Sequence, residues 1–252
     1  GQPLLLEGPG YFELSEDGLV RCGESEGIRV RNATGSQRRI IVEDVDPPSD
    51  ILTAATVIQN QLFRDLFSEQ TLSPEATVSL RPVAFMFSDL KGSTAMYEAN
   101  GDAASFGKVK AHFDILLSTL ADHSGTLVKT IGDAVMATFE DPADGMRCAI
   151  AMQRRMKAES DLTIKLGLHY GRAMAVTLND RLDYFGATVN RSARLEGQSK
   201  GGDVVCSRAV YDDPEVSLLL KKSGLDLQHE SVQVKGVEEP MQVVRIQVVE
   251  PA

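Results

Sequence analysis

The sequence has few cysteines, few histidines and no long apolar run, and each shortage excludes a class of protein. Its 3 cysteines lie far apart, without the spacing of a zinc site or of a disulfide-rich secreted domain. Its 4 histidines form no metal-binding or triad pattern. No stretch of ~18 apolar residues is present, and the apolar start at residues 3–6 is too short for a signal peptide. We therefore predict a cytoplasmic protein with reduced thiols and no membrane-spanning segment.

Positive charge is also scarce. The 252 residues carry 26 basic and 36 acidic side chains, so the net charge is −10. Such a field repels a phosphate backbone, and we predict no nucleic-acid partner. Lysine is absent before Lys91, which indicates a compositional boundary near Pro82. The length fits one large domain or two small ones, and 42% hydrophobic residues are enough for a sizeable core.

The first 80 residues are typical of a small module followed by a connector. Short segments rich in strand-forming residues at 11–14, 27–31 and 38–45 are separated by turn residues, which predicts a small β-rich module over residues 1–50. Apolar residues within 53–67 recur at helical spacing, which predicts one helix in a connector over residues 51–81. We expect the module either to bind a regulator or to act as a rigid spacer that orients the connector.

From residue 82 to residue 252 the pattern alternates between strand and helix. Strands are expected at 83–87, 126–130, 134–139, 162–170, 173–178, 204–206, 228–234 and 241–248, with helices at 93–123, 142–158 and 186–196. The first helix is expected to break near Gly101. The order β-α-β-β-α-β predicts an α+β, ferredoxin-like domain with appended elements, preceded by the small mainly-β module.

Two carboxylates stand at the ends of predicted strands. Asp89 follows the strand at 83–87, and Asp133 lies at the tip of the hairpin over 126–139. On adjacent strands both side chains would reach a common point, where they suit one or two Mg²⁺ ions that share their shell with phosphate and water. The alternative is that Asp89 caps the next helix and Asp133 fills a turn.

A glycine and two hydroxyl residues follow the first carboxylate. Gly92, Ser93 and Thr94 stand where the next helix begins, and backbone N–H groups at a helix start form a phosphate-binding arrangement. The same residues are also an ordinary helix cap. Beside a metal-binding carboxylate they favour a nucleoside triphosphate as ligand.

Three segments resemble the signature segments of class III nucleotidyl cyclases, in the family's order. They are Phe87-Ser88-Asp89-Leu90-Lys91-Gly92-Ser93-Thr94, Val128-Lys129-Thr130-Ile131-Gly132-Asp133-Ala134-Val135-Met136 and Asp183-Tyr184-Phe185-Gly186-Ala187-Thr188-Val189-Asn190-Arg191-Ser192-Ala193-Arg194. The resemblance covers about residues 82–248, and it adds a nucleotide cyclase activity to the expectations above.

The resemblance implies a role for each motif residue. The metal-binding positions are Asp89, Leu90 and Asp133, for two Mg²⁺ or Mn²⁺ ions per active site. The phosphates would be held by the amides of Gly92, Ser93 and Thr94. Asn190 would position the ribose, and Arg194 would stabilise charge on the α-phosphoryl group. Asn190 and Arg194 are four apart and share one helical face.

The resemblance also implies a choice of base. Adenine-specific members of the family have Lys and Asp at the positions of Lys129 and Asp183, where Lys donates to the ring N1 and Asp accepts from the exocyclic amine. Guanine presents the reverse pattern, and guanylate enzymes have Glu and Cys at these positions. The substrate is therefore expected to be ATP and the product 3′,5′-cyclic AMP. A plain surface ion pair between Lys129 and Asp183 is the alternative.

Family members form head-to-tail dimers in which metal carboxylates of one subunit face the base and ribose residues of the other. Because this chain has both sets, the resemblance implies a homodimer with two composite sites and a nearly inactive monomer. Lys235 is the one lysine near the position from which many mammalian relatives contact triphosphate, and its role is left open. Two alternatives remain: a guanylate or pyrimidine nucleotide cyclase, and a non-catalytic nucleotide-sensing module.

Overall fold

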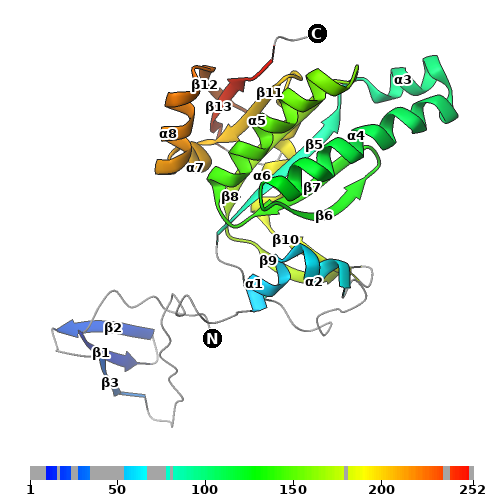
Figure 1. Ribbon diagram of the computed structural model, residues 1–252. Coiled ribbons are helices and arrows are strands. Elements are labelled where there is room, and N and C mark those ends of the chain that lie inside the picture. The colour runs from blue at the N-terminus through cyan, green and yellow to red at the C-terminus, as the bar shows by residue number, and fades with distance from the viewer. Residues whose placement is uncertain are drawn as a thin grey trace. The chain divides into compact units, whose positions relative to one another are not determined.

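A computed structural model describes residues 10–15, 18–23, 28–34, 54–66, 78–79, 82–178, 181–234 and 239–249 of the chain (Figure 1). The chain divides into two compact units, Gly1–Ile51 and Leu52–Ala252. The connector helices therefore belong to the same unit as the sequence motifs. No helix within the described ranges is both long and apolar enough to cross a membrane.

The first unit contains a three-stranded sheet. Its strands are β1 (Gly10–Ser15), β2 (Gly18–Gly23) and β3 (Ile28–Asn32), in the order β2-β1-β3. β1 pairs with β2 antiparallel and with β3 parallel. The side chain of Asn32 accepts a hydrogen bond from the backbone N–H of Thr34 at 3.0 Å, which closes the turn after β3. The strand expected at 38–45 lies outside the described residues.

The connector forms two short helices, α1 (Ala54–Ile58) and α2 (Gln61–Leu66), so the prediction of a single helix is wrong. The side chain of Asn60 accepts a hydrogen bond from the backbone N–H of Phe63 at 3.1 Å. This is the contact of a helix N-cap, and it starts α2 afresh after a turn. Ile58 of α1 is buried, whereas Leu62 and Leu66 of α2 are 65% and 67% exposed, so the apolar periodicity does not form one buried face across both helices.

The second unit is built on a seven-stranded sheet of order β12-β13-β11-β8-β5-β7-β6. Its strands are β5 (Val83–Leu90), β6 (Thr126–Ile131), β7 (Ala134–Phe139), β8 (Ile164–Gly171), β11 (Asp203–Ser207), β12 (Asp226–Val232) and β13 (Met241–Gln247). Counting β5, β6, β7 and β8 as the four core strands, their order in the sheet is 4-1-3-2 with antiparallel neighbours. That is the ferredoxin-like arrangement, and the predicted α+β class is confirmed.

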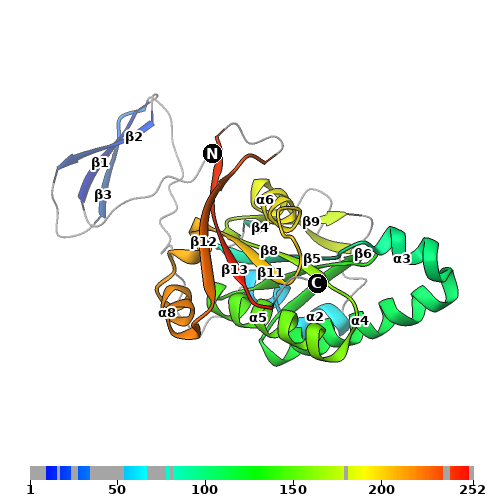
Figure 2. The ribbon, with the colours of Figure 1, turned by 90° about the horizontal axis from the view of Figure 1, so that it is seen from above.

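Helices cover both faces of this sheet. They are α3 (Ser93–Asn100), α4 (Asp102–Asp122), α5 (Pro142–Glu159), α6 (Ala187–Glu196), α7 (Arg208–Tyr211) and α8 (Pro214–Ser223). Figure 2 shows α4 and α5 on one side of the sheet and α6 on the other. A second sheet of order β10-β9-β4 is formed by β4 (Val78–Ser79), β9 (Met174–Leu178) and β10 (Arg181–Phe185).

The central strand β5 is buried on both faces and divides the core in two. Ala84, Met86 and Leu90 belong to the larger cluster, which includes buried residues of α4 and α5. Val83, Phe85 and Phe87 belong to a second cluster with Ile58 of α1, Met136 of β7 and residues of β9 and β10. Side chains of a strand alternate between its faces. One face of β5 therefore packs against α4 and α5, and the other packs against α1, β9 and β10.

The two strands expected at 162–170 and 173–178 belong to different sheets. β8 pairs with β5 and β11, whereas β9 pairs with β10 and β4. Elements β4, β10, α7 and α8 were not expected. Helix α8 has a clear local signal, because Asp213 accepts from the N–H groups of Glu215 and Val216 and Pro214 occupies its first turn.

Candidate active site

Asp89 and Asp133 reach one region from two neighbouring strands. Strand β5 continues through Leu90, so Asp89 lies within the strand rather than after it, opposite Lys165 of β8. Asp133 follows Gly132 in the turn between β6 and β7, and Gly132 has a φ of 63°, which favours glycine. The buried ring of His112 donates from Nε2 to the backbone carbonyl of Asp133 at 3.2 Å and fixes this turn.

The electrostatics of this region disfavour the charged form of Asp89 unless a cation is bound. Burial raises the pKa of the Asp89 carboxyl above its usual range, and the charge of Asp133 raises it further. Atom Oδ2 of Asp133 is buried without a hydrogen-bond partner among the described residues. Uncompensated buried carboxylate oxygens fit a divalent cation, which favours oxygen ligands.

The other predicted metal position, Leu90, has a buried side chain in the larger core cluster. Only its backbone carbonyl is chemically suited to bind a cation. No group of three or more His, Cys, Asp or Glu side chains that would hold a metal occurs within the part of the chain described here. Two carboxylates agree with Mg²⁺, which is usually bound through one or two carboxylates, water and substrate phosphates rather than by an all-protein cage.

A third carboxylate, which the sequence motifs did not indicate, lies beside the pair. Glu196 ends α6, and its side chain is 17% exposed, 3.9 Å from Nζ of Lys165. The helix comes this close because β8 has a glycine beneath it: a Cβ at Gly167 would lie 2.1 Å from the backbone nitrogen of Glu196. One sequence signal was available, since Lys165 is the charged residue in the otherwise apolar run from Ile164 to Leu168.

The pKa of Glu196 gives a pH-dependent stability. Burial raises its pKa to about 7, with further contributions from the charges of Asp89 and Asp133. Between its usual pKa near 4.5 and this value, the folded protein holds a proton that the unfolded chain releases. The free energy of unfolding therefore falls as the pH rises through this window, by up to about 3 kcal/mol.

We expect Glu196→Gln to remove this dependence. In EDTA the wild type should lose stability to urea between about pH 5 and pH 8, because Glu196 becomes charged without a cation. The variant should show a flatter profile and greater stability at pH 8. Glu98→Gln, at an exposed position of α3, is the control and should follow the wild type. Equal pH slopes for wild type and Glu196→Gln would contradict the assignment.

The predicted phosphate-binding residues lie at the start of α3, directly after β5. Gly92 is the N-cap residue with a φ of 74°, and no side chain in the described structure forms a capping hydrogen bond there. The backbone N–H of Lys91 is bonded to the carbonyl of Thr163 at 2.9 Å, which anchors the loop. Ser93 and Thr94 occupy the first turn, where N–H groups of a helix are available to an anion.

Lys129 and Asp183 are brought together from different sheets. The Nζ of Lys129 donates to Oδ2 of Asp183, and the two form an ion pair. Asp183 is 7% exposed, and its Oδ1 accepts from the N–H of Tyr184 at 2.8 Å. No hydrogen bond or ion pair joins this pair to Asp89 or Asp133 within the described ranges. The functional residues therefore fall into two groups that no such bond links, one at the carboxylates and one at Lys129 and Asp183.

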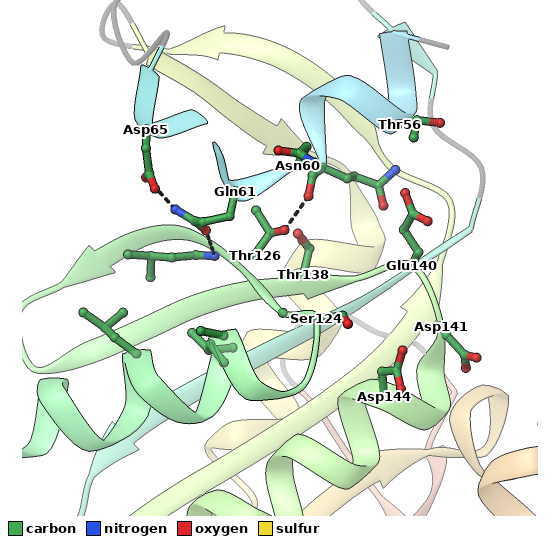
Figure 3. Close-up of a pocket in the computed structure, with 16 residues that line it drawn as sticks. Thr56, Asn60, Gln61, Asp65, Ser124, Thr126, Thr138, Glu140, Asp141 and Asp144 are labelled. Atoms are coloured by element: carbon green, nitrogen blue, oxygen red, sulfur yellow. Dashed lines mark hydrogen bonds between the residues drawn. The ribbon is translucent and has the colours of Figure 1, made fainter. Parts of the chain in front are cut away.

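Asn190 and Arg194 lie on α6, one helical turn apart, with Asn190 exposed and Arg194 half-buried. Lys235 lies outside the described residues. A pocket of about 920 Å³ is found elsewhere, between the connector and α4, β6 and β7 (Figure 3), and none of the predicted site residues lines it.

Residues 76–247 match the family described as adenylate and guanylate cyclase catalytic domain. The chain belongs to this family. The resemblance to class III cyclases and the prediction of a nucleotide cyclase are thereby confirmed. The family includes both adenylate and guanylate cyclases.

Curated relatives of this cyclase domain include adenylate cyclase 1 of Rhizobium meliloti, 31% identical over 150 residues, which are 51% of this chain and 23% of that protein. Adenylate cyclase of Mycosarcoma maydis is 28% identical over 168 residues, or 56% of this chain and 7% of that protein. The chain spans less than a quarter of the length of either.

Solved structures agree on the cyclase fold. The adenylyl cyclase CyaB from P. aeruginosa aligns with a TM-score of 0.59 at 24% identity, over 70% of this chain and 97% of that one. The guanylate cyclase domain of RhGC from Catenaria anguillulae, in complex with GTP, aligns with the same TM-score of 0.59 at 20% identity, over 69% of this chain and 100% of that one. Both enzyme types therefore share the fold.

Proposed function

We propose that the chain is an adenylate cyclase that converts ATP to 3′,5′-cyclic AMP and pyrophosphate. The observation that carries this proposal is the contact between Lys129 and Asp183. A donor beside an acceptor matches the ring N1 and the exocyclic amine of adenine, whereas the edge of guanine presents an N–H and a carbonyl in the same places. Without substrate, Lys129 and Asp183 are paired with each other, and adenine replaces this ion pair when it binds.

The remaining residues are proposed to act on the ribose and the phosphates. Asn190 orients the ribose, and Arg194 stabilises negative charge on the α-phosphoryl group as the 3′-oxygen attacks it. Amides at Gly92, Ser93 and Thr94 bind the phosphates.

Asp89, Asp133 and the carbonyl of Leu90 are proposed to hold two Mg²⁺ or Mn²⁺ ions. When bound, these ions lower the pKa of the 3′-hydroxyl and neutralise the leaving pyrophosphate. The buried, uncompensated oxygen of Asp133 supports this assignment.

The two groups of residues are proposed to meet across a head-to-tail homodimer. The lack of a hydrogen bond or ion pair between Lys129 or Asp183 and the carboxylates among the described residues supports this arrangement, in which one chain supplies half of each of two sites. We further propose that residues 1–50 are a β-rich module, that residues 51–81 connect it, and that residues 82–252 are the catalytic domain. A regulator of the first module would then act through the connector.

Incubation with ATP, GTP, CTP and UTP, each with Mg²⁺ or Mn²⁺, tests the proposal. We expect 3′,5′-cyclic AMP as the main product, identified by mass and by comparison with the 2′,3′ isomer. Cyclic GMP as the main product would overturn the assignment of Lys129 and Asp183. Tight nucleotide binding without any product would favour a nucleotide-sensing module instead.

A further inference from the structure

The connector forms hydrogen bonds with β6, the strand that contains Lys129. The carbonyl of Gln59 accepts from the hydroxyl of Thr126, and the side chain of Gln61 accepts from the backbone N–H of Leu127 at 2.7 Å (Figure 3). β6 is an edge strand of the seven-stranded sheet, so its outer backbone groups need partners. Gln61 supplies one for the N–H of Leu127.

Arg64 of α2 extends this contact to both strands of the base-recognition pair. Its Nη2 donates to the carbonyl of Leu182 at 2.8 Å and to the carbonyl of Val128 at 3.4 Å. These carbonyls belong to the peptide groups directly before Asp183 and Lys129. The orientation of a peptide group sets the φ angle of the next residue and thus the direction in which its side chain leaves the backbone.

Among the described strands, no backbone pairing sets the spacing of Lys129 and Asp183. β6 pairs with β7 and β10 pairs with β9, and within the described strands no ladder joins β6 to β10. The register of β6 also shifts between Leu127 and Lys129. Val128 is therefore the extra residue of a β-bulge, a feature that redirects neighbouring side chains and frees a carbonyl from the ladder.

The surroundings of Arg64 indicate a geometric role rather than a charge-pairing one. The guanidinium is half-buried, lies 5.6 Å from the ring centroid of Tyr184 and donates from Nη1 to the carbonyl of Ile58 at 3.4 Å. No carboxylate pairs with it in the part of the chain that the structure describes. A planar group with several donors is suited to join two carbonyls at a fixed distance, which an ammonium group is not.

We propose that Arg64 is a positioning residue for base selectivity, holding Lys129 and Asp183 at the spacing that matches adenine. This inference rests on the proposed function. It also gives the connector a direct route to the base site, because a displacement of α2 would change the two peptide groups that Arg64 holds.

The test compares ATP with inosine triphosphate, which differs from ATP at the hydrogen-bonding edge of the base. Arg64→Ala should lower the ATP preference in kcat/KM about tenfold, mainly through KM. Asp183→Ala should lower it at least as much, and the double variant should show little further loss, because both changes remove the same discrimination. Arg64→Lys should restore only part of the preference.

Gln61→Ala is the matched control, since it removes a different connector side-chain contact with β6 but leaves Arg64 in place. It should lower the melting temperature about as much as Arg64→Ala does and keep the wild-type ATP preference. An unchanged preference in Arg64→Ala, equal losses in both variants, or additive effects of Arg64 and Asp183 would overturn the proposal.

A binding measurement separates this inference from the proposed function. ATP and inosine triphosphate compete with a fluorescent ATP analogue, and the ratio of their dissociation constants is determined for each variant. If the wild type makes no cyclic AMP, the proposed function fails while this ratio still tests Arg64. If Arg64→Ala does not fold, the ratio for Arg64→Lys decides, and a wild-type value would contradict the proposal.

Discussion

Asp89→Asn is expected to lower cyclic nucleotide formation by about 10³-fold or more, a loss of several kcal/mol of transition-state stabilisation, without destabilising the protein. The substitution keeps the size of the side chain and removes the charge that would bind the cation. Because burial and the neighbouring Asp133 both disfavour a charged Asp89, the metal-free variant should melt at the same temperature as the wild type or above it.

Product formation and thermal unfolding measure the two parts of this expectation. Adding Mn²⁺ should raise the melting temperature of the wild type, since a ligand of the folded state stabilises it, and should raise that of Asp89→Asn much less. Asp114→Asn, an exposed position on α4, serves as the control and should behave like the wild type. Undiminished product formation by Asp89→Asn would refute the metal assignment, and an inactive variant with a lowered melting temperature would indicate a role in folding.

The catalytic fold was predictable because its strongest signals are local. Residues 83–87 form a continuous apolar run, as expected of a strand buried on both faces, and Pro142 at a first turn indicates the start of α5. The separation of β8 from β9 was not predictable. The choice of different sheets depends on the pairing of β8 with β5 and of β9 with β4, two strands that lie far away in the sequence, in addition to the local pairing of β9 with β10.

The site residues also divide into those that the sequence motifs indicate and those that tertiary contacts bring into place. Motif spacing located Asp89, Asp133, Lys129 and Asp183, because their neighbours in the sequence carry the signal. The segment Phe63-Arg64-Asp65-Leu66-Phe67 resembles a segment ahead of some bacterial cyclases, but the contacts of Arg64 have no local signal, since its acceptors lie 64 and 118 residues further along the chain. Glu196 has only the indirect signal of Lys165 in an apolar run, because its own position depends on the close approach of α6 to Gly167. Side chains that act through tertiary contacts are visible only once the elements are placed.

Mixing two inactive variants is expected to restore activity if the sites are shared between subunits. Asp89→Asn changes one of the proposed metal-binding carboxylates. Arg194→Ala removes the residue proposed to stabilise charge on the α-phosphoryl group. In a heterodimer both changes fall in one composite site, and the other site is intact. With random pairing of equal amounts, half of the dimers are mixed, so about one quarter of the wild-type activity should return.

Co-expression with two affinity tags allows the mixed dimer to be purified, and it should then have about half of the wild-type activity per dimer. The control pairs Asp89→Asn with Asp133→Asn, because both variants change a proposed metal-binding carboxylate. Each site of that mixed dimer contains one changed carboxylate, so no activity should return. Restoration in the control would indicate that the carboxylates come from different subunits, and restoration in neither pair would place the complete site within one chain.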